Sequence, residues 1–363
     1  MRITFVLDTF RGGGKERRCL QVIQGLNKEG VTDIQVVIVN NDVAYKELYE
    51  TSAKVEIIDR KNRCLSQIQT AKELYRLLKS FSPDIVQAWG IMSAGVVLMV
   101  KPLLKFRFFA SYVADVYPPK GINGMINRIC NLCCEKIVSN SKAGIVAYQT
   151  PKKKSIVIYN GFNEARFDNK IDKSLKKEEL NINTPFAVAM VATFWQTKDW
   201  QCYIDTAKRI IKQRKDITFL AIGKGPQWNY YNKQIKEKER SLIKMLGRRD
   251  DVDEIYQICD LTVLCSTHGE ALSNSIMESM AWGVPVIASP GGGTPEIIVN
   301  NVNGKLIDEQ TPERVGTLIT ELIDQPETLA LMSEKASQTI QNRFLLHRMT
   351  EEYLVLYKNE KSS

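Results

Sequence analysis

Short runs of β-branched and aromatic residues alternate with amphipathic segments along most of the chain. After Gly14 the apolar residues recur at intervals of three and four, as on one face of a helix, and Gly30 ends this pattern. The segment from Leu65 to Leu78 has the same spacing. Strands that alternate with helices of this length are typical of parallel sheets covered by helices on both faces. The first half contains these strand candidates: Ile3–Leu7, Ile34–Val39, Val55–Ile58, Ile85–Trp89, Phe108–Val113, Lys136–Ser139 and Ser155–Tyr159.

The alternation stops at a polar stretch, residues 167–184, which we interpret as a linker or a surface helix, and then restarts. Residues 311–359 read as helix. A length of 363 residues suggests two domains. We therefore predict an α/β protein with two Rossmann-like, doubly wound domains facing across a cleft, at 1–165 and 166–345, and a helix at 346–363 that crosses back to the first domain. The second half has these strand candidates: Phe186–Ala192, Ile217–Ile222, Ser241–Leu246, Leu261–Cys265, Val284–Ala288 and Lys305–Ile307.

The excess of positive charge is confined to the first half of the chain. The formal net charge is +9, and residues 1–165 contain 24 basic and 14 acidic side chains, whereas the remainder contains 26 and 27. Such asymmetry suggests an acidic partner of the first half, such as phosphate, anionic lipid or nucleic acid. The alternative is a solvated basic surface, which for any single lysine is the better interpretation. The composition is that of an ordinary globular protein, and no apolar run reaches the roughly 20 residues of a membrane span.

The eight cysteines mostly lie in apolar surroundings, where a free thiol behaves as a small buried hydrophobe. Cys130, Cys133 and Cys134 have the spacing of half a zinc site, but no second pair of ligands completes it. The chain has only two histidines, His268 and His347. We therefore expect no metal and a cytoplasmic location, where thiols stay reduced.

A glycine-rich loop, residues 8–17, follows the first strand and opens the first helix, a suitable place to hold phosphate on helix N–H groups. It is not a dinucleotide fingerprint, because Arg17 stands where the third glycine belongs. It is not a Walker A loop, because Glu16 follows Lys15. The loop alone favours phosphate or sugar contact only slightly over a flexible turn.

The segment from 266 to 285 carries the strongest candidate chemistry. Ser273, Asn274 and Ser275 stand where a helix begins, so their polar groups and the free N–H groups there suit an anion. Glu270 precedes that helix and Glu278 lies eight residues later, and either carboxylate could accept hydrogen bonds from sugar hydroxyls. For Glu278 an alternative is open, because Ser275-x-x-Glu278 is also a capping box.

Two more loops follow strands of the second half. In the loop after Phe186–Ala192, Lys198 could pair with a diphosphate as a point charge, and Trp195 is either a stacking platform or, more commonly, a core or rim residue. The loop Gly291–Glu296 brings three glycines to the start of a helix, which permits either close approach of a ligand to the backbone or a plain tight turn.

These residues together resemble glycosyltransferase family 4, the retaining glycosyl transferases group 1 with the GT-B fold. In the first half, Gly13-Gly14-Lys15-Glu16 looks like the family's Gly-Gly-x-Glu loop. The resemblance covers nearly the whole chain and is strongest from 186 to 308. Its motifs there are Glu270-x7-Glu278, Ala281-Trp-Gly-Val-Pro-Val-Ile-Ala288, Gly292-Gly-Thr-Pro-Glu-Ile-Ile298 and Asn303-Gly304.

The resemblance implies a role for each matching residue. Glu278 would hold the nucleotide ribose, and Glu270 would face the donor sugar. The diphosphate would be lined by the following residues: Gly13, Gly14, Lys198, Ser273, Asn274 and Ser275. No cofactor is implied beyond the nucleotide-sugar donor, UDP- or GDP-linked, whose leaving phosphate is thought to assist deprotonation of the acceptor.

The sequence departs from the family pattern at two places. Thr193 stands where the family usually has arginine beside the diphosphate, and the loop after Phe108–Val113 lacks the histidine of many members. A charge at contact distance contributes about 4 kcal/mol at an effective dielectric of about 20, so the loss is substantial. Asp115 in that loop, which we include among the catalytic candidates, or Arg11 would have to compensate.

We therefore expect an enzyme, a hexosyl- or N-acetylhexosaminyltransferase that acts on a glycan or lipid-linked acceptor in surface polysaccharide synthesis. Its basic first half would contact the anionic inner face of the plasma membrane, with Ile91–Leu104 either an interfacial helix or a buried helix of the sheet. The alternatives are a catalytically impaired nucleotide-sugar-binding protein and a nucleotide-sugar epimerase. Nucleic-acid binding has only the charge in its favour.

Overall fold

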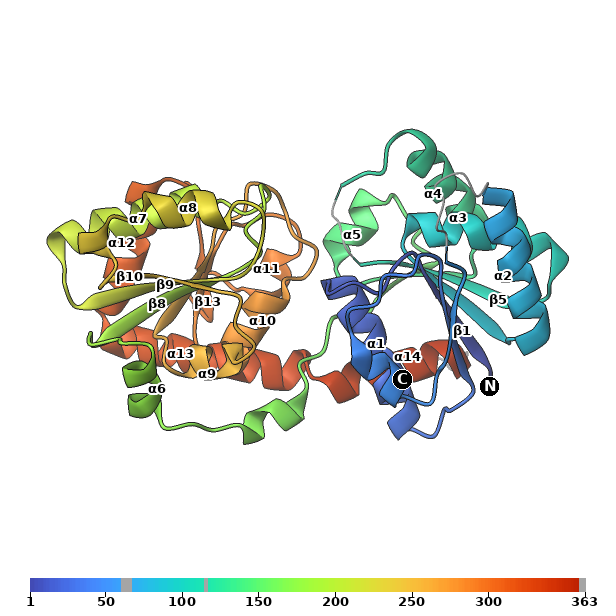
Figure 1. The fold of residues 1–363 in the computed structure, drawn as a ribbon, viewed down its shortest axis with the longest axis horizontal. Coiled ribbons are helices and arrows are strands. Elements are labelled where there is room, and N and C mark those ends of the chain that lie inside the picture. Colours follow the sequence, from blue (N-terminus) through green and yellow to red (C-terminus); the bar gives the residue numbers. More distant parts are fainter. Residues whose placement is uncertain (60–66, 114–116, 359–363) are drawn as a thin grey trace. The chain divides into compact units, whose positions relative to one another are not determined.

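The computed structural model describes the chain except for residues 60–66, 114–116 and 359–363. Two compact units make up the fold (Figure 1). Unit 1 contains Met1–Gly161 together with the C-terminal helix α14 (Leu346–Lys358), and unit 2 contains Phe162–Leu345. None of the helices in the part of the chain that is described is both long and apolar enough to span a membrane.

Unit 1 is built on a parallel sheet in the strand order β3-β2-β1-β4-β5-β6-β7. The register places Ile3 beside Ile34 on one side and beside Ile85 on the other. The strands run over β1 (Ile3–Leu7), β2 (Ile34–Ile38), β3 (Lys54–Ile57), β4 (Ile85–Trp89), β5 (Arg107–Tyr112), β6 (Lys136–Ser139) and β7 (Ser155–Val157).

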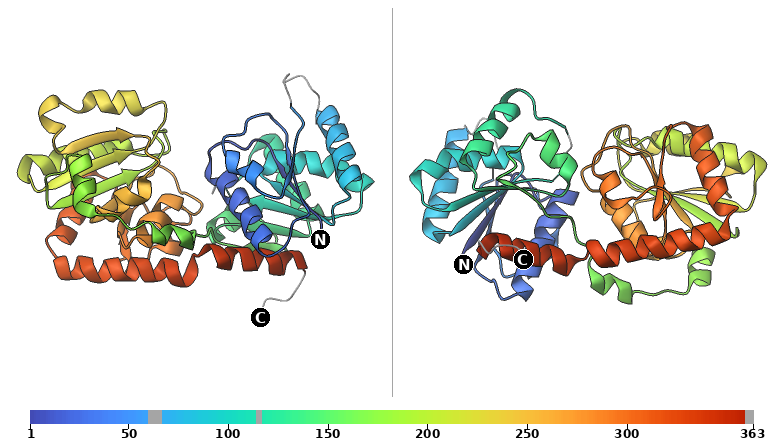
Figure 2. Two further views of the ribbon diagram at one scale, coloured as in Figure 1. Left: turned by 60° about the horizontal axis from the view of Figure 1, so that its bottom comes forward. Right: turned by 180° about the vertical axis from the view of Figure 1, so that it is seen from behind.

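Helices cover both faces of this sheet (Figure 2). Successive residues of a strand point to opposite faces, so Phe5 packs in one cluster with α1 and α14 while Val6 packs in another with α2, α3 and α4. The helices are α1 (Gly14–Lys28), η1 (Lys46–Glu50), α2 (Gln67–Phe81), α3 (Ile91–Val100), η2 (Lys101–Leu103), α4 (Gly121–Cys133) and α5 (Lys142–Ala147).

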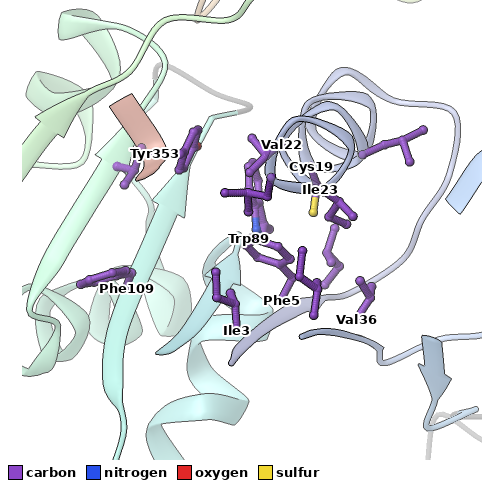
Figure 3. Packing of buried hydrophobic residues seen from close by; sticks show 14 of the residues in the cluster. Ile3, Phe5, Cys19, Val22, Ile23, Val36, Trp89, Phe109 and Tyr353 are labelled. Carbon is purple, nitrogen blue, oxygen red and sulfur yellow. The ribbon is translucent and has the colours of Figure 1, made fainter. Parts of the chain in front are cut away.

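The C-terminal helix α14 packs against α1 and closes one of these two clusters. Trp89 of β4 lies between Phe5 and Tyr353 of α14, with ring centroids 6.1 and 6.3 Å away (Figure 3). The buried Arg18 of α1 donates to the Ile158 carbonyl at 2.5 Å, and its guanidinium lies over the Tyr353 ring. The last helix of the chain is therefore part of the unit 1 core.

Helix α3 is the segment for which two interpretations were open. Ser93, Ala94, Val96, Val97 and Val100 are buried, and α3 packs between α2 and α4 on the sheet. The structure therefore supports the buried helix, and this packing explains most of the apolar residues of Ile91–Leu104. Three others are exposed: Met92, Met99 and Leu103.

Unit 2 repeats the architecture with the strand order β10-β9-β8-β11-β12-β13, again parallel. On one face, Ala187 and Ala189 pack with Leu180 and Ile182, which follow α6, and with Ile255 of α9. On the other, Tyr203 of α7 donates to the carbonyls of Val188 and Leu220. The strands are β8 (Phe186–Val191), β9 (Ile217–Ile222), β10 (Ile243–Gly247), β11 (Leu261–Leu264), β12 (Val286–Ala288) and β13 (Gly304–Leu306).

The helices of unit 2 lie between and after these strands. They are η3 (Glu164–Asp168), α6 (Lys173–Glu179), α7 (Trp200–Gln213), α8 (Trp228–Gln234), η4 (Glu237–Glu239), α9 (Val252–Gln257), α10 (Asn274–Ala281), α11 (Thr294–Ile297), α12 (Pro312–Ile323) and α13 (Pro326–Arg343). The polar stretch 167–184 thus contains the end of η3 and the surface helix α6. The C-terminal region is helical as expected and contains three helices. Pro326 separates α12 from α13, because it has no N–H to continue α12 and instead occupies the first turn of α13.

All the strands expected from the sequence are present, most of them with one or both ends shifted. The largest shifts at a strand start are two residues, in β10, which begins at Ile243 rather than Ser241, and in β12, which begins at Val286 rather than Val284. Gly283, with φ of 72°, ends α10, and Pro285 has no N–H to donate to a neighbouring strand. The predicted start of the second helix at Leu65 lies outside the described residues.

Candidate active site

Strands β8 and β11 are neighbours in the unit 2 sheet, and the chain leads away from them to opposite edges. The loops that follow two such strands turn in opposite directions and leave a crevice between them. Open α/β sheets bind their ligands in this crevice. Here the two loops are joined by their backbones: Asp199 donates to the Cys265 carbonyl at 3.0 Å, and Thr267 donates to the Thr197 carbonyl at 3.1 Å. Lys198 and Ser266 form an antiparallel bridge beside them.

This backbone pairing brings Lys198 and Glu270 together from positions 72 residues apart. The Lys198 ammonium donates to the Glu270 carboxylate, and the Ser266 hydroxyl donates to the same oxygen at 2.6 Å. Burial lowers the pKa of Lys198 to about 8, while the adjacent carboxylate favours its charged form. A cation and an anion are thus held side by side at the end of the sheet.

Three glycines position the loop that carries Glu270. The Gly293 N–H donates to the Glu270 carbonyl at 2.7 Å, and Glu270 forms a parallel bridge with Gly292. A Cβ atom at Gly292 would lie 1.9 Å from the Glu270 carbonyl oxygen, and one at Gly269 would lie 2.6 Å from the Gly292 nitrogen. The glycines of the 291–293 loop therefore permit its backbone to approach that of residues 269–270. The sequence had left open whether these glycines serve a ligand or a tight turn.

Helix α10 begins next to this loop. Ser273 is its N-cap residue, is buried, and has its hydroxyl 3.0 Å from that of Ser275, while Asn274 and Ser275 are half-buried. The helix start therefore presents hydroxyl and backbone N–H groups next to Glu270. The capping-box interpretation of Glu278 is wrong, because α10 starts before Ser275, which places that serine inside the first turn.

Glu278 instead lies in an ion-pair network that the sequence did not reveal. Arg166 donates to Glu278 Oε1 at 3.1 Å and to both carboxylate oxygens of Asp253, at 2.5 and 2.8 Å. The Trp282 indole donates to Asp253 at 3.0 Å. Burial disfavours the Arg166 cation, but the hydrogen bonds and charges of Asp253 and Glu278 outweigh burial and raise its pKa. Glu278 is thus buried and held in place by a permanent cation.

The remaining candidates of the β8 loop are exposed. Thr193 has its side chain at the surface, and its carbonyl accepts from the Trp200 indole at 3.0 Å. Trp195 is 49% exposed and therefore is not a core residue, which leaves the stacking and rim interpretations. The core aromatic of this loop is its neighbour Phe194, which stacks on Trp200 with a centroid distance of 3.8 Å.

In unit 1 the corresponding switch point lies between β1 and β4. Gly13 is the N-cap residue of α1, Gly14 begins that helix, and the buried Glu16 folds back toward Gly13. Lys15 lies 3.3 Å from Glu16 and 4.0 Å from Asp8, and burial raises the pKa of the Asp8 carboxyl. The loop therefore places charged groups as well as glycines at the end of the sheet.

Two groups were expected to compensate for missing family residues. Arg11 is exposed and donates to Asp42, so its charge is paired with an acid of its own unit. Asp115 lies outside the described residues, and its role stays a prediction. In the described ranges no three or more His, Cys, Asp and Glu side chains gather as metal ligands would.

A family model described as "Glycosyl transferases group 1" matches residues 172–339, the region that carries Lys198, Glu270 and Glu278. The chain is a glycosyltransferase. The lipopolysaccharide core biosynthesis glycosyltransferase LpsE of Rhizobium meliloti is 21% identical over 347 residues, 95% of this chain and 96% of LpsE. An alpha-1,3-galactosyltransferase of Escherichia coli, which by its name uses UDP-Gal and alpha-D-GlcNAc-diphosphoundecaprenol, is 26% identical over 81% of this chain and 80% of its own length.

The solved structures agree on the fold of this glycosyltransferase. Anabaena HepE in complex with UDP superimposes with a TM-score of 0.86 and 21% identity, over 99% of this chain and all of HepE. HepE has also been solved with UDP-glucose. The two parallel-sheet, Rossmann-like units of this chain are therefore those of the GT-B fold, as predicted.

The candidate site thus combines predicted and unpredicted residues. Lys198, Glu270, Ser273, Asn274, Ser275 and Glu278 all belong to unit 2, and Lys198 and Glu270 touch. The sequence analysis missed Arg166, which pairs with Glu278, and Asp253, which pairs with Arg166. In the sequence, Arg166 stands next to a stretch interpreted as a linker. Its link to the candidate site is its contact with Glu278, which lies 112 residues away in the chain.

Proposed function

We propose that this glycosyltransferase is a retaining, metal-independent enzyme that transfers a hexosyl or N-acetylhexosaminyl group from a UDP- or GDP-linked donor. The single observation that supports the proposal most is the Lys198–Glu270 pair at the switch point, next to the start of α10. A donor's diphosphate is the ligand that would compete for the Lys198 ammonium, and the helix N–H groups would take its remaining oxygens.

The two carboxylates, Glu270 and Glu278, would bind the other two parts of the donor, the sugar and the ribose. Once the ammonium turns to the diphosphate, the Glu270 carboxylate can accept hydrogen bonds from the sugar hydroxyls. Glu278, held by Arg166, is placed one helical turn further on, where it would accept from the ribose. In a retaining transfer the C1–O bond breaks with its electron pair going to the diphosphate. The acceptor oxygen bonds to C1 from the same side, and its proton passes to the leaving phosphate.

The acceptor is proposed from the relatives. LpsE is named for lipopolysaccharide core synthesis, and the Escherichia coli enzyme is named for a diphosphoundecaprenol-linked acceptor. We propose a glycan or lipid-linked acceptor in surface polysaccharide synthesis, met at the inner face of the plasma membrane by a cytoplasmic protein. The net charge of residues 1–165, 24 basic against 14 acidic side chains, suits such an anionic acceptor and surface.

A second candidate function is donor binding without transfer. It is favoured by Thr193, which is exposed and uncharged where the family usually has a cation for the diphosphate. The epimerase alternative has no such observation in its favour.

The first test measures the thermal unfolding of the protein in the presence of UDP, GDP and their common sugar conjugates. A ligand at 100 times its Kd stabilises by about 2.7 kcal/mol, which is easily measured. The donor that stabilises is then incubated with glycan and polyprenyl-diphosphate acceptors in EDTA, and the anomeric configuration of the product is read by NMR. Transfer with retention supports the proposal, whereas inversion or a strict need for a divalent cation contradicts it.

Glu270→Gln should abolish transfer while the protein remains folded, with Glu313→Gln, a change of an exposed glutamate on α12, as the control. Activity of Glu270→Gln near that of the control would contradict the role of Glu270. Donor binding without turnover by the unmodified protein on every acceptor class would favour the second candidate function.

A further inference from the structure

Helix α4 exposes an apolar face, which is unusual because the outer face of a surface helix is normally polar. Ile122 is 65% exposed, Met125 53%, Ile129 41% and Leu132 78%. Their spacing of three, four and three residues places them on one face of the helix, and Asn127 and Cys130 are buried on the other. We call these four exposed residues the α4 stripe.

The stripe belongs to a well-packed helix rather than to a loosely attached one. Helix α4 packs against α3, and Asn127 donates to the Tyr148 carbonyl, next to the end of α5, at 2.9 Å. Val146 of α5, 75% exposed, adds a further apolar side chain close to that contact. The α4 stripe is therefore held outward by the fold and is not an unpacked piece of the core.

The charged residues of the segment that carries the stripe are almost all positive. Between Asp115 and Glu164 the sequence has one acid, Glu135, which pairs with Arg107 at 2.7 Å. Lys154 donates to the Leu132 carbonyl at 2.6 Å, which places this lysine at the C-terminal end of the stripe. The same segment holds seven basic residues: Lys120, Arg128, Lys136, Lys142, Lys152, Lys153 and Lys154.

We propose that the α4 stripe is the membrane-docking face of this protein and inserts at the headgroup level of a bilayer rich in anionic lipid. An apolar helix face with a basic surround is the pattern of an interfacial helix, since the bilayer takes up the apolar side chains while its phosphates attract the lysines. A second copy of the chain is disfavoured as the occupant, because two such basic surfaces would repel each other.

The proposal names the surface through which the proposed lipid-linked acceptor would be reached, and to that extent it rests on the proposed function. It also moves the interfacial element away from Ile91–Leu104, where Ala94, Val96, Val97 and Val100 are buried in the core. The physical argument itself depends only on the exposed side chains and the charges of α4 and its surroundings.

The test is co-sedimentation of the full chain with vesicles of phosphatidylcholine mixed with phosphatidylglycerol, and with vesicles of phosphatidylcholine alone. The stripe variant carries Ile129→Ser and Leu132→Ser. Its matched control carries Ile68→Ser and Leu331→Ser, an isoleucine and a leucine that are 69% and 57% exposed on α2 and α13. A third variant carries Lys152→Gln and Lys153→Gln, both exposed.

We expect binding to the anionic vesicles and little binding to phosphatidylcholine alone. The stripe variant should bind the anionic vesicles about tenfold more weakly or worse, because each lost apolar side chain removes a large part of the insertion free energy. The lysine variant should lose about fivefold per lysine, less at high salt. The matched control should bind like the unmodified protein.

Equal losses in the stripe variant and its control would overturn the proposal, as would equal binding to both kinds of vesicle or none to either. A dimer that light scattering detects and the stripe variant abolishes would also overturn it, in favour of self-association. UDP binding, measured by calorimetry on the same variants, should not change. Vesicle binding without any nucleotide or donor binding would contradict the proposed function and leave the docking face standing.

Discussion

Gly292→Ala tests whether the close approach of two backbones positions the carboxylate of Glu270. Gly292 has φ of 65°, and a Cβ atom there would come 1.9 Å from the Glu270 carbonyl oxygen and 2.7 Å from its nitrogen. No side-chain rotation relieves a clash between a Cβ atom and backbone, so the loop around Glu270 has to move. The perturbation reaches Glu270 without changing any of the groups proposed to touch the donor.

The magnitude follows from comparison with a second glycine of the same unit. Gly247 has φ of 68°, but a Cβ atom there would meet only the Trp228 indole nitrogen at 3.8 Å, an ordinary contact. Gly247→Ala therefore shows the cost of the left-handed backbone alone, about 1–2 kcal/mol. Gly292→Ala adds an overpacking cost of about 1–3 kcal/mol. We expect a total loss of about 3 kcal/mol, which lowers Tm by about 6–12 °C for a unit of this size.

The assay is calorimetric unfolding together with UDP-sugar binding and transfer, for both variants. Gly292→Ala should lose most of its transfer activity, because a displacement of about 1 Å at a reacting group can cost about 100-fold. Gly247→Ala should keep donor affinity and activity. If both variants showed the same Tm and the same activity, the argument that the glycine loop positions Glu270 would be refuted.

Two further predictions concern the charges of the site. Burial lowers the pKa of Lys198 to about 8, so its ammonium loses its proton as pH rises through that value. The affinity for UDP should therefore fall between about pH 7 and 9.5. Calorimetry checks this, and in the variant Lys198→Met the fall should disappear. Asp253→Asn removes the bidentate partner of Arg166, so stability should fall by about 2 kcal/mol and UDP should bind several-fold more weakly. The control Asp250→Asn, at an exposed pair with Arg248, should change stability by less than about 0.5 kcal/mol, and equal effects of both variants would contradict a role of Asp253 in holding Arg166.

Much of the fold could be predicted because its elements are encoded locally. The strands of both sheets consist of β-branched and aromatic runs, and the core-facing helices show their apolar spacing directly, as α1 does at Cys19, Val22, Ile23 and Leu26. The errors are confined to the ends, where local signals compete. Pro285 shortens β12, and Pro326 divides the C-terminal helices.

The candidate site was predicted only where its residues are close in the chain. Glu270, Ser273 and Glu278 share one loop and helix, so their spacing carried the signal. Arg166 carried none, because an arginine in a polar stretch is ordinarily solvated, and only folding places it between Asp253 and Glu278. The capping-box error has the same origin, since Ser275 and Glu278 have the right spacing but the helix starts too early.

The sequence by itself determined the order of strands and helices along the chain, the division into two α/β units, and the choice of residues 266 to 296 as the main candidates for the chemistry. Periodicity and turn residues act over a few positions, so this information can be read without the fold. Only the tertiary structure decided which charges meet and which apolar faces stay uncovered: Lys198 with Glu270, Arg166 with Glu278, α3 buried and α4 exposed. The physical reason is that pairing and burial depend on neighbours supplied by distant parts of the chain.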